Sequence, residues 1–167
     1  GQPPSVVSEG CTYFHEEVGL NSRLDAIQAA IPDVKLPHLE RWNSECRLCA
    51  DRYRLFFESL GLTERVTLPH EREGNYHIYP QYAVRVPDRD KLMGYLDELG
   101  VTTRVYYPLP LHLQPCFAFL GGRRGDCPEA ERLSQEALAL PIFPGLKAEE
   151  QERVVKAIAA FLSYHPC

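Results

Sequence analysis

The sequence predicts an α+β domain in which helices cover one side of a small sheet of three to four strands. Apolar residues recur at steps of three and four from Leu39 to Leu60, as they do on one face of a helix. Apolar and polar residues alternate over residues 78–86, as they do in a half-buried strand. A second long helical pattern, from about residue 148 to 162, begins with acidic residues that the helix dipole favours.

The chain is expected to consist of a loose N-terminal arm over residues 1–18 and one domain over residues 19–167. The arm contains proline, glycine and serine without a steady period. The domain is expected to begin with a short helix, which Ser22 and Asp25 cap as a pair and which ends or kinks at Pro32. The other expected elements are a second helix starting near residue 37, helices over 88–99 and 128–137, a strand over 101–107, and short apolar pieces over 66–68 and 138–143.

The composition argues against several classes of protein. The 167 residues suffice for one well-buried core. A net charge of -5 and a pI of about 5.7 argue against a surface that binds nucleic acid. No apolar run approaches the length of a membrane span, and no basic stretch followed by an apolar block opens the chain. We therefore expect neither anchor nor signal peptide, and a cytoplasmic protein.

The six cysteines are expected to be thiols, because the chain can build an apolar core without disulfides. Cys46 and Cys49 form a CxxC pattern, which is typical of half a zinc site or of a redox pair. Both lie on the apolar face of the long helix, where free cysteine is a common core residue. We therefore predict no metal. The zinc alternative would need Cys116 and Cys127 as ligands, and elemental analysis would distinguish the two.

No hydrolase or nucleotidase motif is present. The six histidines are scattered, and none stands four residues from another with a glutamate between them, as a helical metalloprotease site requires. The sequence contains no G-x-S-x-G motif and no P-loop. The glycine-rich stretch at 121–125 is more typical of a turn than of a phosphate-binding loop.

Arg23 places a positive charge in the first turn of the first expected helix, where the helix dipole is already positive. One interpretation is that Arg23 extends into solvent or pairs with Glu16, Glu17 or Asp25. The other is that Asn21, Ser22 and Arg23 present an amide, backbone N–H groups and a guanidinium to a bound phosphate. The residues alone leave both interpretations open.

Five segments, in this order and spacing, resemble the second half of the DegT/StrS family of pyridoxal-phosphate (PLP)-dependent sugar-nucleotide aminotransferases. They are GLNSRLDAIQAAI, KLPHLERWN, YPQYAVRVPDRD, YPLPLHLQPCF and GDCPEAERLSQEALALPIFPGL, and the similarity covers about residues 13–163. The resemblance implies the small C-terminal domain of a fold type I enzyme, usually a homodimer. Such enzymes move an amino group from glutamate or another amino acid to a keto-sugar nucleotide, in the synthesis of polysaccharides and glycosylated antibiotics.

The resemblance also implies roles for individual residues. Asn21 stands where the asparagine of the family's G-x-N-x-R motif reaches the cofactor phosphate in the partner's active site, and Arg23 matches the arginine of that motif. Tyr107 and His112 lie in a segment that the family places near the small-domain edge of the active site, so they are candidates to touch substrate. The alternative for that proline-rich segment is that it only fixes a crossing between elements.

The family's large domain, which holds the Schiff-base lysine, the aspartate on the pyridine nitrogen and the stacking aromatic residue, precedes the region of similarity. The lysines of this chain stand in segments that the family uses for structure: Lys35, Lys91, Lys147 and Lys156. We therefore expect no catalytic residue here, no transamination by this chain alone, and no binding of PLP by it alone.

Three residues depart from the family's pattern. Pro80 stands where relatives commonly have histidine in the motif H-x-Y-H-Q-Y, and Tyr106 stands where many have histidine. Pro32 replaces a leucine in the first helix. The two prolines remove backbone donors from regular elements, which indicates either relaxed constraint or a divergent copy.

A second hypothesis is a stand-alone dimerisation or binding module derived from the family, which pairs with itself or with a full-length relative. A concentration-dependent dimer without cofactor colour would favour this hypothesis. In either case the face that packs on the large domain in relatives would be open, so we expect self-association through the first two helices.

Overall fold

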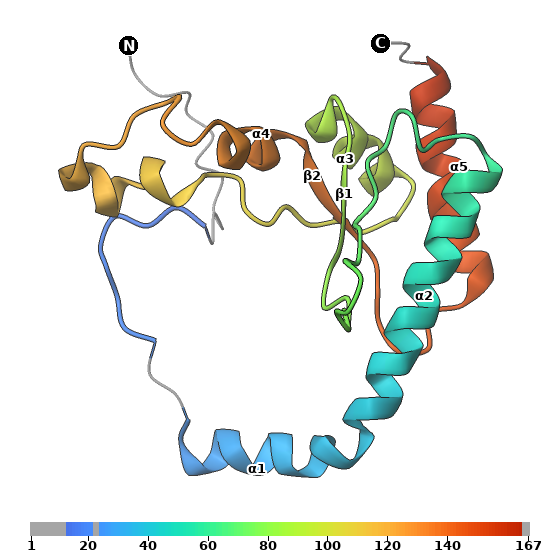
Figure 1. The fold of residues 1–167 in the computed structure, drawn as a ribbon, viewed down its shortest axis with the longest axis horizontal. Helices are drawn as coiled ribbons and strands as arrows, with labels where there is room; N and C mark the ends of the chain where they lie inside the picture. The colour runs from blue at the N-terminus through green and yellow to red at the C-terminus, as the bar shows by residue number, and fades with distance from the viewer. Residues whose placement is uncertain (1–12, 22–23, 165–167) are drawn as a thin grey trace. The chain divides into compact units, whose positions relative to one another are not determined.

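The computed structural model describes residues 13–21 and 24–164, and Figure 1 shows their fold. The chain divides into two compact units, one formed by Gly1–Asn21 and Tyr107–Gln135, and the other by Ser22–Tyr106 and Glu136–Cys167. The elements in chain order are α1 (Ala26–Lys35), the 3-10 helix η1 (Leu36–His38), α2 (Leu39–Ser59), β1 (Tyr82–Arg85), α3 (Arg89–Glu98), η2 (Leu111–Leu113), η3 (Pro115–Leu120), α4 (Pro128–Glu136), β2 (Ala137–Leu140) and α5 (Ala148–Tyr164).

Strands β1 and β2 pair antiparallel, with Tyr82 opposite Leu140 and Arg85 opposite Ala137. Single bridges extend this ladder on both sides, from Thr67 to Arg85 and from Arg104 to Ala139. The described residues therefore contain two strands rather than the predicted three to four, because each outer segment pairs at only one position. Strand β1 is also shorter than the predicted 78–86.

Proline explains the short strands, because it has no N–H to donate to a ladder. Pro80 and Pro87 stand on either side of β1, and Pro141 follows β2 directly. Tyr79, just before Pro80, has a φ of 47°, which is not a strand conformation. The mixed helix-and-sheet architecture is as predicted.

The hydrophobic core lies in the second unit, between one face of the sheet and helices α2, α3 and α5. Alternate strand residues face it, because side chains of a strand point to opposite faces in turn. These inward residues are Tyr82, Val84, Leu138 and Leu140. Helices α2 and α5 pack side by side over them (Figure 1). Leu92 and Leu96 of α3 complete the core.

Tyr53 of α2 joins the helix layer to the sheet. Its ring stacks on that of Tyr82 with a centroid distance of 4.9 Å, and its hydroxyl donates to the carbonyl of Pro141 at 2.8 Å. Burial raises the pKa of both phenols well above the ordinary value. Both phenols therefore stay neutral, and the Tyr53 hydroxyl acts as a hydrogen-bond donor.

The CxxC pattern belongs to the same helix. Cys49 is buried in the core, as predicted, with its Sγ 3.8 Å from the Leu146 carbonyl oxygen. Cys46 is partly buried, and burial is the main cause that raises the pKa of its thiol. In the described part of the chain, no three histidine, cysteine, aspartate or glutamate side chains gather where they could hold a metal ion.

Helix α1 begins differently from the prediction. Its N-cap is Asp25, whose carboxylate accepts the Gln28 N–H at 2.7 Å, so the expected pairing of Ser22 with Asp25 is wrong. Ser22 itself lies outside the described residues. The helix also continues past Pro32 to Lys35 rather than ending there. A proline removes only one backbone donor, and the rest of the ladder continues.

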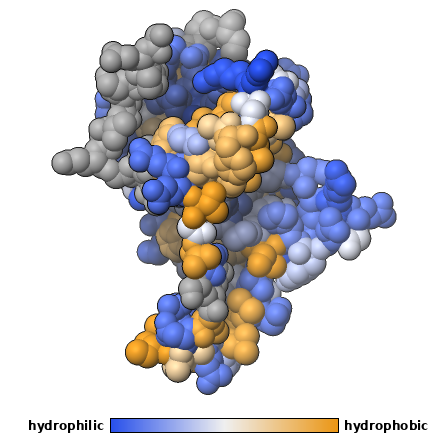
Figure 2. Space-filling model, turned by 90° about the vertical axis from the view of Figure 1, so that its left-hand side faces the viewer, coloured by the Kyte–Doolittle hydropathy of each residue, from blue (hydrophilic) through white to orange (hydrophobic). Residues whose placement is uncertain are grey.

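Helix α1 buries none of its residues, and its apolar side chains are exposed: Ile27, Ile31 and Val34. Figure 2 shows apolar surface over this helix, in the lower part of the view. Among the described residues, no helix is both long and apolar enough to cross a membrane.

Candidate functional site

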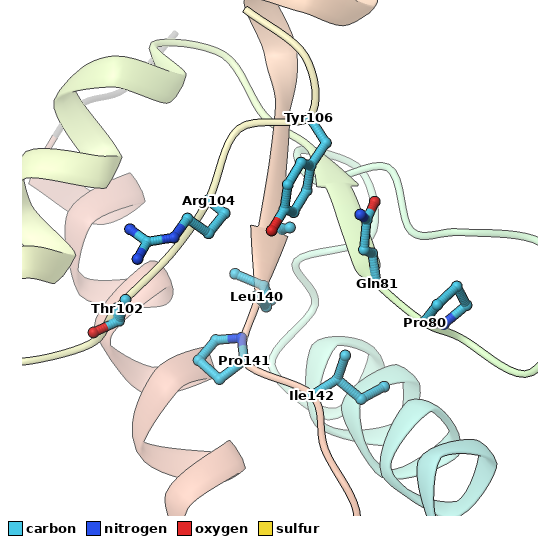
Figure 3. Close-up of a pocket in the computed structure, with 9 residues that line it drawn as sticks. Pro80, Gln81, Thr102, Arg104, Tyr106, Leu140, Pro141 and Ile142 are labelled. Atoms are coloured by element: carbon cyan, nitrogen blue, oxygen red, sulfur yellow. The ribbon is translucent and has the colours of Figure 1, made fainter. Parts of the chain in front are cut away.

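A pocket of about 140 Å³ opens beside the end of β2 (Figure 3). Three segments far apart in the chain form it: the residues just before β1, the extended segment after α3, and the end of β2 with the turn that follows. The lining residues are Pro80, Gln81, Thr102, Arg104, Tyr106, Ala139, Leu140, Pro141 and Ile142.

The period of a strand explains why these side chains meet. Along 101–106, Thr102, Arg104 and Tyr106 alternate with residues that are buried or packed on the core, so they share the opposite face. Backbone hydrogen bonds pair Arg104 with Ala139 at 3.1 and 2.8 Å, and Ala139 is in turn opposite Ala83 of β1. Cross-strand partners lie on one face of a sheet. Ala83 and Ala139 have small side chains, so this face of the sheet leaves space for the pocket.

The chain that leads to Pro80 and Gln81 is anchored on α2. Arg47 donates to both oxygens of Glu71, at 2.9 and 3.1 Å, and to the carbonyl of His77 at 2.7 Å. The guanidinium lies 4.4 Å from the ring centroid of Tyr76. Glu71 also accepts the N–H of His77 at 2.8 Å. The Arg47 hydrogen bond, followed by that of His77, lowers the pKa of Glu71 below its ordinary value. The rim of the pocket is therefore held by a charged cluster.

Asn21, which the resemblance assigns to the cofactor phosphate, is exposed, and its role toward the phosphate stays a prediction. Arg23 lies outside the described residues, and its role stays a prediction. The expectation that backbone N–H groups near Ser22 and Arg23 would reach the same anion also stays a prediction, because both residues lie outside the described residues. At the start of α1 the Asp25 carboxylate accepts the N–H of Gln28, so this donor is taken and a negative charge stands there.

Tyr107 and His112, the predicted substrate contacts, both belong to the first unit. Tyr107 is exposed, and its ring meets that of Tyr13 edge to face at 5.2 Å. His112 is mostly buried, and its Nε2 lies 3.0 Å from Glu131 Oε1. The N–H of Gly125 donates to the same oxygen at 2.7 Å. The hydrogen bond from Gly125 is the main cause that lowers the pKa of Glu131 below its ordinary value. The hydrogen bond with His112 lowers this pKa further.

Glu131 of α4 thus holds both His112 and the glycine-rich stretch, which supports the alternative that this region fixes the course of the chain. Its role toward substrate stays a prediction. The sequence contained no signal for Glu131 as a partner, since the two residues stand 19 positions apart.

Gln114 fastens the end of the predicted N-terminal arm. Its side chain is buried, accepts the N–H of His15 at 3.1 Å and donates to the carbonyl of Tyr13 at 2.8 Å. Residues 13 and 15 are therefore held in place. Residues 1–12 lie outside the described residues, so the arm over 1–18 stays a prediction.

Comparison with known proteins gives the family. The sequence matches the DegT/DnrJ/EryC1/StrS aminotransferase family over residues 4–159. The chain belongs to this family. It is 53% identical over 150 residues to a pleiotropic regulatory protein of Geobacillus stearothermophilus, covering 89% of this chain and 40% of that protein. It is 37% identical over 147 residues to the dTDP-3-amino-3,4,6-trideoxy-alpha-D-glucose transaminase of Streptomyces venezuelae, covering 87% and 38%.

Solved structures of DegT/DnrJ/EryC1/StrS proteins match the fold as well. The crystal structure of DesV from S. venezuelae superposes with a TM-score of 0.76 at 34% identity, over 92% of this chain and 40% of that one. The structure of NtdA from Bacillus subtilis with bound cofactor PMP superposes with a TM-score of 0.72 at 29% identity, over 87% of this chain and 34% of that one. The chain thus spans about 40% of the length of the relatives it matches.

Within the DegT/DnrJ/EryC1/StrS pattern, the pocket beside β2 brings two departures together. Pro80 and Tyr106, the positions at which the resemblance expects histidine, both line it. Gln81, Thr102 and Arg104 were not expected there from the sequence. The alternation along 101–107 was the available signal, but it does not tell which face of a strand is the open one.

Proposed function

We propose that this chain is the C-terminal part of a PLP-dependent aminotransferase that acts on keto-sugar nucleotides in polysaccharide or glycoside biosynthesis. The observation that carries the proposal is the match to sugar-aminotransferase relatives along most of the chain, in sequence and in fold. A second relative is the UDP-N-acetyl-3-dehydro-alpha-D-glucosamine 3-aminotransferase of Acidithiobacillus ferrooxidans, which is 35% identical over 147 residues. Both names describe enzymes that act on nucleotide sugars.

When bound, PLP supplies the electron sink that amino-group transfer needs. In this proposal Asn21 and Arg23 contribute to holding the cofactor phosphate in the neighbouring protomer. Asn21 is exposed, and a side-chain amide carries N–H donors of the kind that a phosphate oxygen accepts. Tyr107 is the exposed candidate for contact with substrate in the first unit.

The lysine that reacts with PLP is proposed to lie outside these 167 residues. All four lysines of the chain are exposed, and the amines of Lys91 and Lys156 pair with Asp88 and Glu152, at 3.0 and 2.8 Å. A lysine nucleophile is instead activated by an apolar pocket or by a neighbouring cation. The surroundings of these lysines therefore support a structural role for each.

Self-association is also part of the proposal. The exposed apolar side chains of α1 are the surface through which copies of the chain would contact one another. The cytoplasmic location stays a prediction from the sequence.

The test of this function uses the polypeptide as its natural host makes it, purified with its own cofactor. We expect glutamate to change the PLP absorbance, and an Asn21→Ala variant to hold PLP about tenfold more weakly, the loss of one charge-assisted hydrogen bond. Asn75→Ala, at an exposed loop position, is the matched control and should retain PLP. A natural protein that binds no PLP would contradict the function, and equal losses in both variants would contradict the role of Asn21.

A further inference from the structure

We propose that the pocket beside β2 binds a small oxyanion, a carboxylate or a phosphate ester, with Arg104 as its cationic partner. The inference goes beyond the proposed function, because it depends only on this pocket and can be tested on the chain without PLP.

Arg104 is the first reason. Among the residues that the structure describes, nothing forms a hydrogen bond or an ion pair with its guanidinium, which is exposed. Some arginines of the same unit have carboxylate partners, among them Arg85 with Glu136 at 2.7 Å and Arg47 with Glu71 at 2.9 Å. Arg85 lies on the same face of the sheet as Arg104. None of the described residues that line the pocket is acidic. The pocket therefore offers a positive charge whose counter-ion the described chain does not supply.

The second reason is the set of hydrogen-bonding side chains that line the pocket with Arg104. In Figure 3 the Arg104 guanidinium and the Thr102 hydroxyl point to the left, whereas the Tyr106 hydroxyl lies above Leu140 and the Gln81 amide lies to the right. A planar guanidinium binds the two oxygens of a carboxylate or a phosphate side by side. The arrangement suits a ligand with an anionic end at Arg104 and a hydrogen-bonding body against Tyr106.

The third reason is the nature of the two departures from the family's pattern. Pro80 and Tyr106 come from different segments, yet both line this pocket. With proline and tyrosine in these places, the described lining contains no histidine, and Arg104 is the one cationic side chain in it. The two replacements therefore change one site together, and they leave Arg104 as the one charged side chain of its described lining.

The test titrates the 167-residue chain with inorganic phosphate and, separately, with glutarate, and follows amide shifts by NMR. We expect saturable shifts at the backbone amides of residues 102–106 and 139–142. Arg104→Gln is expected to weaken binding about tenfold or more, and Arg104→Lys to retain part of it. Arg72→Gln removes an equal charge from an exposed loop position and should leave binding unchanged. Unchanged shifts elsewhere verify that each variant is folded.

The two ligands separate the two sources of the anion. Saturation by phosphate alone supports a phosphate ester, and saturation by glutarate alone supports an organic acid. Saturation by both supports a general oxyanion site. Shifts that never saturate, or an equal loss in Arg104→Gln and Arg72→Gln, would overturn the proposal. Because PLP is absent from this experiment, its failure would leave the amino-transfer test untouched, and the reverse also holds.

Discussion

A Phe57→Ala variant is expected to unfold with a free energy about 3–5 kcal/mol lower than that of the parent chain. Phe57 lies on α2, is fully buried, and belongs to the core that joins this helix to the sheet and to α5. Truncation removes the ring from that core and leaves a cavity that packed neighbours fill only in part. Urea unfolding followed by circular dichroism measures the change.

Leu55→Ala on the same helix is the matched control. Leu55 is 55% exposed, so its truncation should cost less than about 1 kcal/mol. Equal urea midpoints for the two variants would show that α2 does not pack on the sheet through Phe57.

A Gly122→Ala variant is expected to strain the glycine-rich stretch of the first unit. A Cβ at this position would lie 2.5 Å from the backbone carbonyl oxygen of His112, a distance that no relaxed contact allows. Overpacking of this kind costs about 1–3 kcal/mol. Because Gly125 N–H is bonded to Glu131 in the same region, its hydrogen exchange should accelerate about fivefold or more.

Gly94→Ala is the control, and it is expected to raise the free energy of unfolding rather than lower it. Gly94 lies inside α3 and is exposed, and no atom lies within 4 Å of the place that an alanine methyl group would take. Alanine should therefore stabilise the helix by about 1 kcal/mol. Unchanged exchange at Gly125 in Gly122→Ala would mean that His112 does not pack against this glycine.

The helices could be predicted well because their signals are local. The apolar period over 39–60 is confirmed by α2, and the acidic start near 148 is confirmed by α5. Asp88 and Gly100 bracket α3 as the sequence indicated. Each of these signals lies within the segment that it describes, so no distant contact was needed to interpret it.

The sheet and the cap of α1 were predicted less well, because in each case two sequence signals disagree about where the element begins or ends. Pro80 and Pro87 shorten the strand that alternation alone extends over 78–86. Both Ser22 and Asp25 are good caps, and the sequence does not say which one the helix uses. The structure assigns the cap to Asp25.

The candidate site was predictable only in part. The motifs that resemble the family led to Asn21, Arg23, Tyr107 and His112, whereas the pair of His112 with Glu131 needed the fold. Arg104 and Gln81 line one pocket only because β2 lies between their segments. Such long-range neighbours leave no mark in a single sequence.

Reductive labelling tests whether the lysine that reacts with PLP lies outside these 167 residues, on which the proposed function depends. The chain is incubated with increasing PLP, reduced with borohydride, and each lysine's modification is measured by peptide mass spectrometry. We expect weak labelling spread over the exposed lysines Lys35, Lys91, Lys147 and Lys156, rising with PLP without saturation. One lysine labelled to completion at an equimolar amount of PLP, with the others unmodified, would show instead that the reactive lysine is in this chain.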